Sequence, residues 1–305
     1  MLLACASTLP DTTSQVTDAR VLAVQVDPAE VEEGDDLTLN ALVADATGAL
    51  DTASVDWSFC SARKALAELG PVSASCLDPA STDLVPIGSG VTVAATMPDD
   101  ACSLFGPNPP AGEDGSGGRP TDADVTGGYY QPILGFADSG DATLVSARVR
   151  CGLPNVSQET YIAWNSSYIN NSNPSIESLT LDGAEVAADG QGDPPVVQPG
   201  AELSLELSWP SCPDAGACDG AETYTVYDPG TATLTTRREA ISATWFSTGG
   251  AFSDTRDGRS GSEEENSVEN TWTAPDVAGE VWMAVVLRDE RGGVGFGGFR
   301  VDVGD

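Results

Sequence analysis

Histidine is absent from the 305-residue chain, and basic residues of any kind are scarce. Without histidine the protein cannot build a Ser-His-Asp triad, a Cys-His dyad or a zinc or iron site with imidazole ligands. Most hydrolase and metalloenzyme classes are thereby excluded. Pairs of carboxylates could still supply acid–base chemistry, but acidic residues are so frequent here that their occurrence alone carries no information.

The 13 basic residues stand against 47 acidic ones, which gives a net charge of -34 and a pI of about 4.1. Lys64 is the single lysine, and the other basic residues are arginines. Nucleic acid and anionic lipid surfaces would repel such a chain. Three explanations of the acidity stay open: a solvated surface that resists aggregation, adaptation to salty surroundings, and binding of divalent cations.

Long apolar runs are also missing, since no later segment approaches the ~20 apolar residues of a membrane-spanning helix. At the N-terminus, however, Leu2-Leu3-Ala4-Cys5 resembles the lipobox of bacterial lipoproteins, whose cysteine takes the lipid. We therefore predict lipidation at Cys5. Residues 1–5 would be the remnant of a signal peptide whose basic and apolar parts are missing, and residues 6–18 a flexible tether. A chance LLAC at a cytoplasmic N-terminus is the alternative.

The chain has seven cysteines and no CxxC motif, which disfavours a cysteine-ligated metal. Once Cys5 is set aside, an even number remains, as expected for three disulfides in an oxidising compartment. We expect a local bridge around the turn-rich PDAGA. The other four cysteines can pair in order along the chain, or the outer two and the inner two can pair; both stay open. The six predicted disulfide cysteines are Cys60, Cys76, Cys102, Cys151, Cys212 and Cys218.

Glycine and proline are frequent, and long helix-forming runs are rare, which is typical of short strands joined by turns. Leu37 and Leu39 alternate with polar residues and predict one strand face, and Trp57 and Phe59 share a core-facing side of another strand. Residues 19–152 are therefore predicted to form an Ig-like β-sandwich. Within it, the Gly-, Pro- and Asp-rich loop 103–128 is long enough to be functional or mobile.

Residues 153–172 are predicted to be a helical linker. Asn155 and Gln158 resemble a capping box, and Tyr161, Trp164 and Tyr168 follow at helical spacing on one face. We expect this aromatic face to pack on a sheet rather than to bind a ligand.

Residues 173–305 are predicted to form a second sandwich. Leucines alternate with polar residues over 203–208, which indicates one buried strand face. Over 281–287 both faces of the expected strand are apolar, which suggests a central strand covered on both sides. DERGG then predicts a hairpin turn before a closing strand.

Three motifs in the sequence resemble binding sites. Gly293, Gly295 and Gly298 spell GxGxxG, but a strand rather than a helix is expected after them, so we assign them to a turn and close packing. The acidic stretches 189–193, 254–258 and 262–266 lack the EF-hand pattern and are better explained as solvated turns. Tyr129 and Tyr130 could stack on a sugar, although adjacent strand residues point to opposite faces.

The C-terminal stretch resembles Ig-like or PKD-like bacterial domains. The residues that carry this resemblance are ATWFSTGG, the step WTAP at 272–275, and Asp289 followed by Gly292 and Gly293. Together with the lipobox, the chain resembles Ig-like surface lipoproteins of high-GC Gram-negative bacteria. The resemblance implies a fold and a location and brings no catalytic residues. The loop 103–128 and the linker helix depart from a plain sandwich.

We thus predict an all-β protein with two Ig-like β-sandwich domains in tandem, joined by a short helix. It would be a non-enzymatic, lipid-anchored protein of the cell envelope, attached to the outer membrane and either periplasmic or surface-exposed, with no catalytic residue, metal or cofactor. Its contacts would be the membrane, through the lipid alone, and a protein or glycan partner, but not nucleic acid. The alternatives are a calcium- or carbohydrate-binding adhesin-like module and a carboxylate-dependent glycosidase or other hydrolase.

Overall fold

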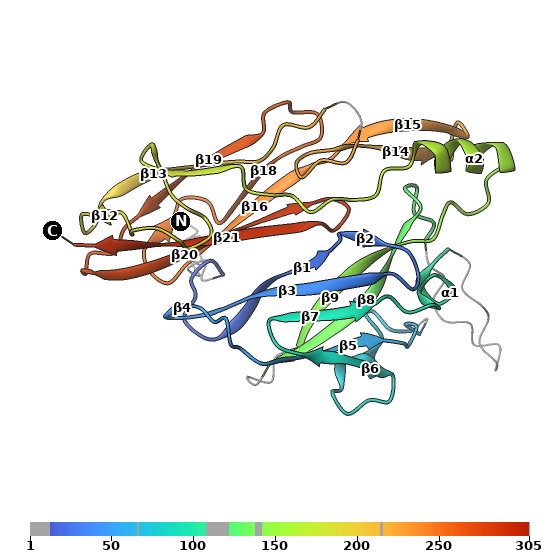
Figure 1. Ribbon diagram of the computed structural model, residues 1–305, viewed down its shortest axis with the longest axis horizontal. Helices are drawn as coiled ribbons and strands as arrows, with labels where there is room; N and C mark the ends of the chain where they lie inside the picture. The colour runs from blue at the N-terminus through green and yellow to red at the C-terminus, as the bar shows by residue number, and fades with distance from the viewer. Residues whose placement is uncertain (1–12, 66, 108–121, 138–141, 214–215, 305) are drawn as a thin grey trace, which may run out of the picture.

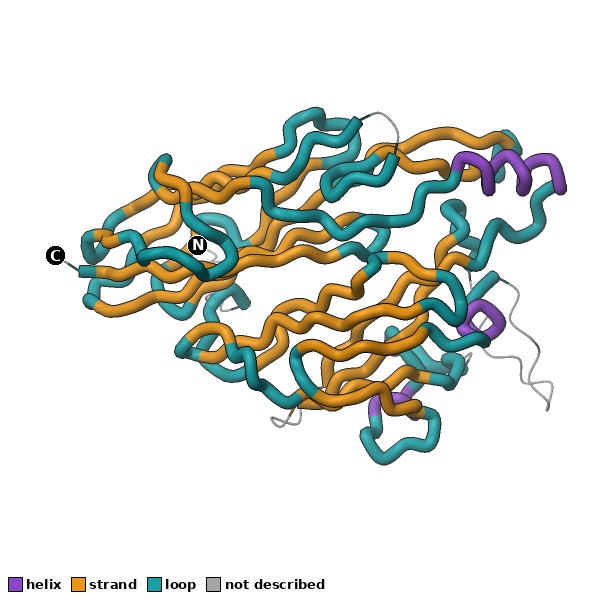
Figure 2. Tube along the Cα trace, viewed as in Figure 1, coloured by secondary structure: helices purple, strands orange, loops and turns teal. Residues whose placement is uncertain are grey.

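The computed structural model describes residues 13–65, 67–107, 122–137, 142–213 and 216–304. The chain is nearly all β, with 47% of residues in strands and 7% in helices. Two β-sandwiches lie against each other, the N-terminal one below and the C-terminal one above in the view of Figures 1 and 2. The predicted all-β class is confirmed.

The first sandwich packs two mostly antiparallel sheets around one core. Leu37 and Leu39 are 2% and 0% exposed, and Trp57 and Phe59 are buried in the same cluster, as their alternation predicts. One sheet contains β1 (Arg20–Asp27), β3 (Asp36–Asp45), β4 (Gly48–Ala49) and β7 (Thr92–Thr96). The other contains β2 (Glu30–Val31), β9 (Ala142–Arg150), β8 (Gly128–Ala137), β5 (Val55–Cys60) and β6 (Leu84–Ser89).

The second sandwich has the same two-layer plan, and its core is built around buried Trp209, Trp245 and Trp272. One sheet contains β11 (Ala184–Glu185), β10 (Ser178–Leu181), β13 (Glu202–Ser208), β19 (Ser267–Thr273) and β17 (Ala251–Phe252). The other contains β12 (Val196–Val197), β21 (Val294–Val303), β20 (Gly279–Asp289), β16 (Ile241–Ser247) and β18 (Arg256–Arg259). A separate hairpin is formed by β14 (Thr223–Asp228) and β15 (Thr233–Arg238).

Strand β20 is covered on both faces, as its sequence predicts. Val281, Met283, Val285 and Leu287 belong to the core of the second sandwich. The opposite face belongs to a different cluster, which it shares with strands β1 and β3 of the first sandwich; its members are Val16, Leu22, Ala23, Leu42, Ala44, Phe246, Trp282, Ala284 and Val286. The second face of β20 therefore forms an apolar interface between the sandwiches.

Short helices occupy the connections. The linker helix α2 (Gln158–Ser167) begins at Ser157, whose Oγ accepts a hydrogen bond from the Thr160 N–H at 3.1 Å. The capping box predicted at Asn155 is therefore wrong, because Ser157 supplies the cap and Asn155 lies before it with a positive φ of 55°. Helix α2 lies beside the β14–β15 hairpin (Figure 1). The other helices are the 3-10 turn η1 (Ala74–Leu77) and α1 (Ala101–Phe105).

Of the aromatic stripe predicted on α2, only Trp164 is fully buried, at 0% exposure. Tyr161 is 43% exposed, and Tyr168 follows the helix as its C-cap. The stripe thus contributes one core residue rather than a continuous packed face. Among the described residues, no helix is long and apolar enough to cross a membrane.

The predicted flexible tether 6–18 is contradicted in its described part. Val16 is 0% exposed and donates its N–H to the Ser247 carbonyl at 2.8 Å, and Ser247 in turn donates to the Ser14 carbonyl. Residues 14–16 thus pack on the second sandwich because Val16 fills the interface cluster. Cys5 lies outside the described residues, as does the middle of the loop 103–128, whose first residues belong to α1.

Six cysteines stand at disulfide distance in three pairs. Cys212 and Cys218 form the local pair, with an S–S distance of 2.11 Å. The other two pairs follow chain order: Cys60–Cys76 at 2.06 Å and Cys102–Cys151 at 2.01 Å. The last pair fastens α1 to the end of β9, at the base of the loop 103–128.

Candidate functional site: a buried polar joint between the sandwiches

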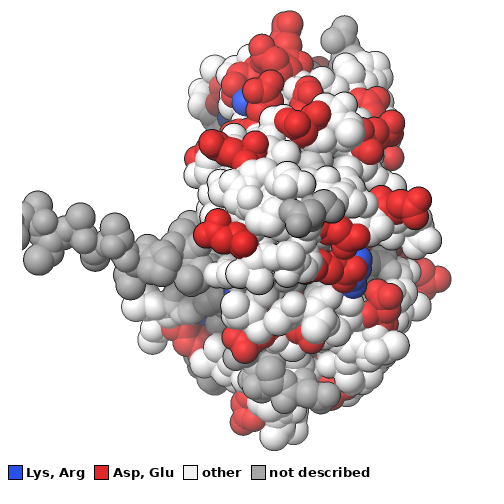
Figure 3. All heavy atoms as spheres, turned by 90° about the vertical axis from the view of Figure 1, so that its left-hand side faces the viewer, with Lys and Arg blue, Asp and Glu red and all other residues white. Residues whose placement is uncertain are grey.

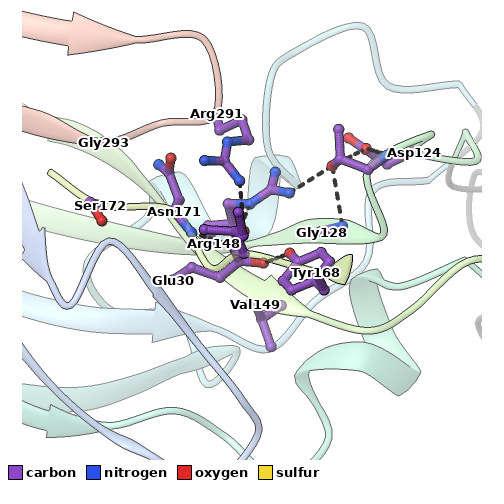
Figure 4. A network of polar contacts seen from close by, with 12 residues as sticks. Glu30, Asp124, Gly128, Arg148, Val149, Tyr168, Asn171, Ser172, Arg291 and Gly293 are labelled. Atoms are coloured by element: carbon purple, nitrogen blue, oxygen red, sulfur yellow. Dashed lines mark hydrogen bonds and ion pairs between the residues drawn. The ribbon is translucent and has the colours of Figure 1, made fainter. Parts of the chain in front are cut away.

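A network of charged side chains lies beside the apolar interface, where the chain passes from one sandwich to the other (Figure 4). On the side of the first sandwich, Glu30 of β2 and Arg148 of β9 are parallel cross-strand partners, with Arg148 Nε 3.3 Å from Glu30 Oε2. Their side chains are 0% and 1% exposed. Glu30 also accepts from the Tyr168 hydroxyl and from the Asn171 N–H at 2.8 Å. One buried carboxylate therefore holds both β9 and the chain that leaves α2.

The guanidinium of Arg148 is satisfied on its other side within the first sandwich. It donates to the Tyr130 hydroxyl at 3.1 Å and to Thr126 Oγ1 at 2.6 Å. Gly128 makes room for it, because a Cβ there would lie 2.1 Å from Arg148 Cζ. Burial is the largest single influence on the pKa of Arg148 and lowers it. The Glu30 carboxylate, together with Tyr168 and Tyr130, more than offsets this and raises the pKa above its ordinary value, so the guanidinium stays charged.

Arg291, in the turn between β20 and β21, is the centre of a second cluster. Its Nε donates to Glu239 Oε1 at 2.6 Å, another nitrogen pairs with Glu222, and a third donates to the Ile169 carbonyl at 3.1 Å. The guanidinium also lies over the Tyr224 ring, 4.4 Å from its centroid. Glu222 comes just before β14 and Glu239 just after β15. This arginine therefore connects the β20–β21 turn to the two chain segments at the open end of the β14–β15 hairpin and to the linker.

Acidic groups outnumber the guanidinium in this cluster. Burial raises the pKa of Glu239 to about 8, the nearby Asp289 adds to the rise, and Arg291 opposes it. Burial likewise raises the pKa of Glu222 to about 7 against the pull of Arg291. The pKa of Asp289 is also raised by burial, although it accepts from the N–H groups of Arg291 and Gly293, both at 2.8 Å. The cluster consequently binds protons near neutral pH.

Several hydrogen bonds link the first sandwich to the second. The Tyr130 hydroxyl donates to the Arg291 carbonyl at 3.1 Å, and Gln25 Nε2 donates to the Val294 carbonyl at 2.8 Å. From the linker, Asn173 Nδ2 donates to the Val26 carbonyl at 2.8 Å. These directional bonds fix the relative placement of the sandwiches that the apolar interface alone would leave free to slide.

The buried charge network between the sandwiches, here called the joint, contains two carboxyl groups whose pKa values are raised, as a carboxylate-dependent hydrolase would need. No substrate can reach them, however. The side chains of Glu222 and Glu239 are both 0% exposed, and each carries an oxygen paired with Arg291. A glycosidase needs its carboxylates on either side of an accessible scissile bond. The arrangement therefore suits a structural joint and not an active site.

The residues that the sequence suggested as sugar or calcium ligands make other contacts. Tyr129 is 2% exposed and so has no free stacking face, and the hydroxyl of the half-buried Tyr130 is bonded to Arg291 and Arg148. Glu263 accepts from Ser260 N–H and Oγ at 2.8 Å each, within its own turn. In the part of the chain that the structure describes, no group of three or more acidic, Cys or His side chains could hold a metal ion.

Of the GxGxxG glycines, Gly293 lies in the turn before β21 and Gly295 and Gly298 lie on β21, and they serve the turn and close packing, as predicted. A Cβ on Gly295 would lie 1.7 Å from the Pro174 carbonyl oxygen, and one on Gly293 would lie 2.8 Å from the Ser172 carbonyl oxygen. The linker therefore passes directly over the backbone of β21. No helix opens at these glycines, so a dinucleotide site is absent from this described stretch.

No protein-family model and no curated protein sequence matches the chain. Among solved structures it is similar to the D00-D0 domain of Intimin, with 8% identity and a TM-score of 0.25, over 93% of this chain and 100% of that one. It is also similar to the Yersinia pseudotuberculosis adhesin InvE, with 10% identity and a TM-score of 0.24, over 93% of this chain and 58% of that one. At such TM-scores these likenesses carry no argument about function.

Proposed function

We propose that the protein is a non-enzymatic, lipid-anchored module of the cell envelope that acts as a rigid binding or structural unit. The observation that carries this proposal is the joint: an apolar interface and a buried charge network together hold two sandwiches in one arrangement. Domains connected by a flexible linker would need neither. A rigid body of this kind suits a spacer, or a platform that presents a protein or glycan partner at a fixed distance from a membrane.

The pairing of the cysteines supports the lipid anchor. All six described cysteines stand in pairs with one another, so none of them is left to bond Cys5. A single remaining cysteine in the context Leu2-Leu3-Ala4-Cys5 is the arrangement that lipidation requires. Three disulfides also favour an oxidising compartment, as the periplasm or cell surface provides.

The anchor and the compartment can be tested together in the native organism. Metabolic labelling with a palmitate analogue should mark the wild-type protein and leave a Cys5→Ala variant unmarked, and globomycin should cause the unprocessed form to accumulate. A non-reducing peptide map should recover the pairs Cys60–Cys76, Cys102–Cys151 and Cys212–Cys218. Free thiols at these positions on an unacylated chain would contradict the proposal.

A further inference from the structure

Three arginines line one open groove at the edge of the second sandwich, although the chain has only 13 basic residues. The groove has a volume of about 390 Å³ and is lined by residues of β16, β18 and the end of β20, among them Arg256, Arg259 and Arg288. The view of one end of the molecule in Figure 3 shows acidic side chains spread widely and basic ones rare. Because most charged side chains on the protein are acidic, this clustering of guanidinium groups calls for a physical explanation.

Strand register places two of these arginines on the same face, on either side of a hydroxyl. Ser242 of β16 is paired with Gly258 of β18 on one side and with Arg288 of β20 on the other. Cross-strand partners share a face, and so do residues two apart, so Arg256, Ser242 and Arg288 share one face. An Arg256 nitrogen indeed donates to Ser242 Oγ at 3.3 Å.

None of the three arginines forms an ion pair with a carboxylate of the described residues. Arg288 donates to the Leu22 carbonyl at 3.2 Å, and Arg259 donates to the Gly258 carbonyl at 3.3 Å. Arg259 Nε is buried and has no hydrogen-bond partner in the described part of the chain. Burial, and after it the charge of Arg256, lower the pKa of Arg288. The guanidinium groups of Arg256 and Arg288 thus repel each other, and the Arg259 Nε donor is unused within the described residues.

The acidic residues that line the same groove are engaged with other groups. Asp257 Oδ1 accepts from the Gly258 N–H at 2.7 Å, and Glu290 Oε1 accepts from the Tyr224 hydroxyl at 2.5 Å. Asp289 accepts from the backbone of its own turn and from Asn171 Nδ2 at 3.1 Å. These carboxylates leave the arginines without a counter-charge in direct contact.

We propose that this groove binds a tetrahedral oxyanion, a phosphate or sulfate group, between Arg256 and Arg288. Guanidinium groups form charge-assisted hydrogen bonds with such oxygens. Ser242 lies between the two arginines, where it accepts from Arg256 and donates to the Arg288 carbonyl at 3.4 Å, and so helps to place them. The net charge of -34 repels polyanions at long range, which restricts the ligand to a small molecule with one such group. This site goes beyond the proposed envelope function and does not depend on the lipid.

The test is calorimetric titration of the full chain, carrying Cys5→Ala to keep it free of lipid, at constant ionic strength in a chloride background. Inorganic phosphate, sulfate and glucose 6-phosphate are the probes, and acetate is the planar comparison. We expect saturable binding of the tetrahedral anions, weakened at least about tenfold by Arg256→Gln, since loss of a charge-assisted bidentate contact is worth about 1.4 kcal/mol or more. Tighter binding of glucose 6-phosphate than of phosphate would identify an ester as the ligand, and the reverse would identify the free ion.

Arg237→Gln is the matched control, because it removes the same unit charge from an exposed arginine on β15, outside the groove. It should leave binding unchanged. Arg256 is exposed, and within the described residues its side chain donates only to Ser242, so Arg256→Gln should fold normally even if Arg288→Gln does not. Absence of saturable binding by the wild-type chain would overturn the proposal, and so would an equal loss in the Arg237 variant.

Discussion

Raising the pH should destabilise this protein through Glu239, and the Glu239→Gln variant should remove that effect. In the folded protein the Glu239 carboxyl keeps its proton up to about pH 8, whereas its ordinary value is 4.5. Between these two values the folded state binds a proton that the unfolded chain has already released. The stability contributed by this proton is thus fully present below about pH 4.5 and is lost as the pH rises through about 8.

The size of the effect follows from the number of protons. Each proton held only by the folded state changes the free energy of unfolding by about 1.4 kcal/mol per pH unit. Glutamine keeps an oxygen for the Arg291 Nε donor but cannot ionise. The free energy of unfolding of the variant therefore lacks the pH dependence that this one proton contributes in the wild-type protein. Relative to the wild-type protein, we expect Glu239→Gln to gain roughly 3–4 kcal/mol between about pH 5 and about pH 8.5. Repulsion among the 47 acidic residues changes alike in both proteins and cancels in this difference.

Urea unfolding followed by tryptophan fluorescence would supply these free energies across that pH range. Glu206→Gln is the control, because Glu206 is exposed on β13 and the substitution removes the same charge. Its stability curve should run parallel to the wild-type curve. If the Glu239→Gln curve also ran parallel to the wild-type curve, the joint would hold no proton at neutral pH, and the electrostatic account of it would be wrong.

Four further substitutions, in three experiments, test the packing and the ion pairing between the sandwiches by the same urea measurement. Glu30→Gln should cost about 3–5 kcal/mol, because it leaves the Arg148 charge buried and unpaired; adding Arg148→Met should recover much of that loss, and full additivity would contradict the pairing. Trp282→Ala should cost about 3–5 kcal/mol through the cavity it opens between the sandwiches, and a loss below about 1 kcal/mol would mean that they are not packed there. Gly295→Val should destabilise by at least about 1–3 kcal/mol, because a Cβ would overlap the Pro174 carbonyl; a neutral result would show that the linker does not cover β21.

The strands and their buried faces could be predicted from sequence wherever the signal is local. Leu205 and Leu207 are both 0% exposed, as the alternation along β13 requires. The apolar residues on both sides of β20 correctly predict a strand covered twice. Alternation depends only on the geometry of a single strand, so it can be recognised without knowing the partner.

The elements that sequence reasoning missed carry weaker local signals. Strand β6 contains Pro86, which argues against a central strand, and β6 is indeed an edge strand of its sheet. Helix α1 has five residues, too few to show a helical period. The identity of what covers the second face of β20 could not be predicted either, because Leu22 and Leu42 are more than two hundred residues away in the sequence.

The buried charge network between the sandwiches also could not be predicted from the sequence, and Arg148 shows why. It follows Ala147 and precedes Val149, both 0% exposed, so the alternation places it on the opposite, solvent-facing side of β9. That side is covered by the chain that leaves α2, a segment without alternation of its own. The one available signal was compositional, since an arginine inside a strand is conspicuous when only 13 basic residues exist.

This scarcity makes each arginine more informative than any acidic residue of the chain. Arg148 and Arg291 are buried against carboxylates, where they fix the joint, and Arg150 and Arg300 form ion pairs closer to the surface. Arg256, Arg259 and Arg288 differ from these four, because none of them forms an ion pair with a carboxylate of the described chain, although Arg259 lies close enough to Glu263 to add to the hydrogen bonds from Ser260 that lower the pKa of that carboxyl. A surface adapted merely to stay soluble would disperse its few cations among its many anions. The two neighbouring guanidinium groups of Arg256 and Arg288, which repel each other and have no ion pair in the described chain, therefore support the proposal that a bound oxyanion supplies their counter-charge.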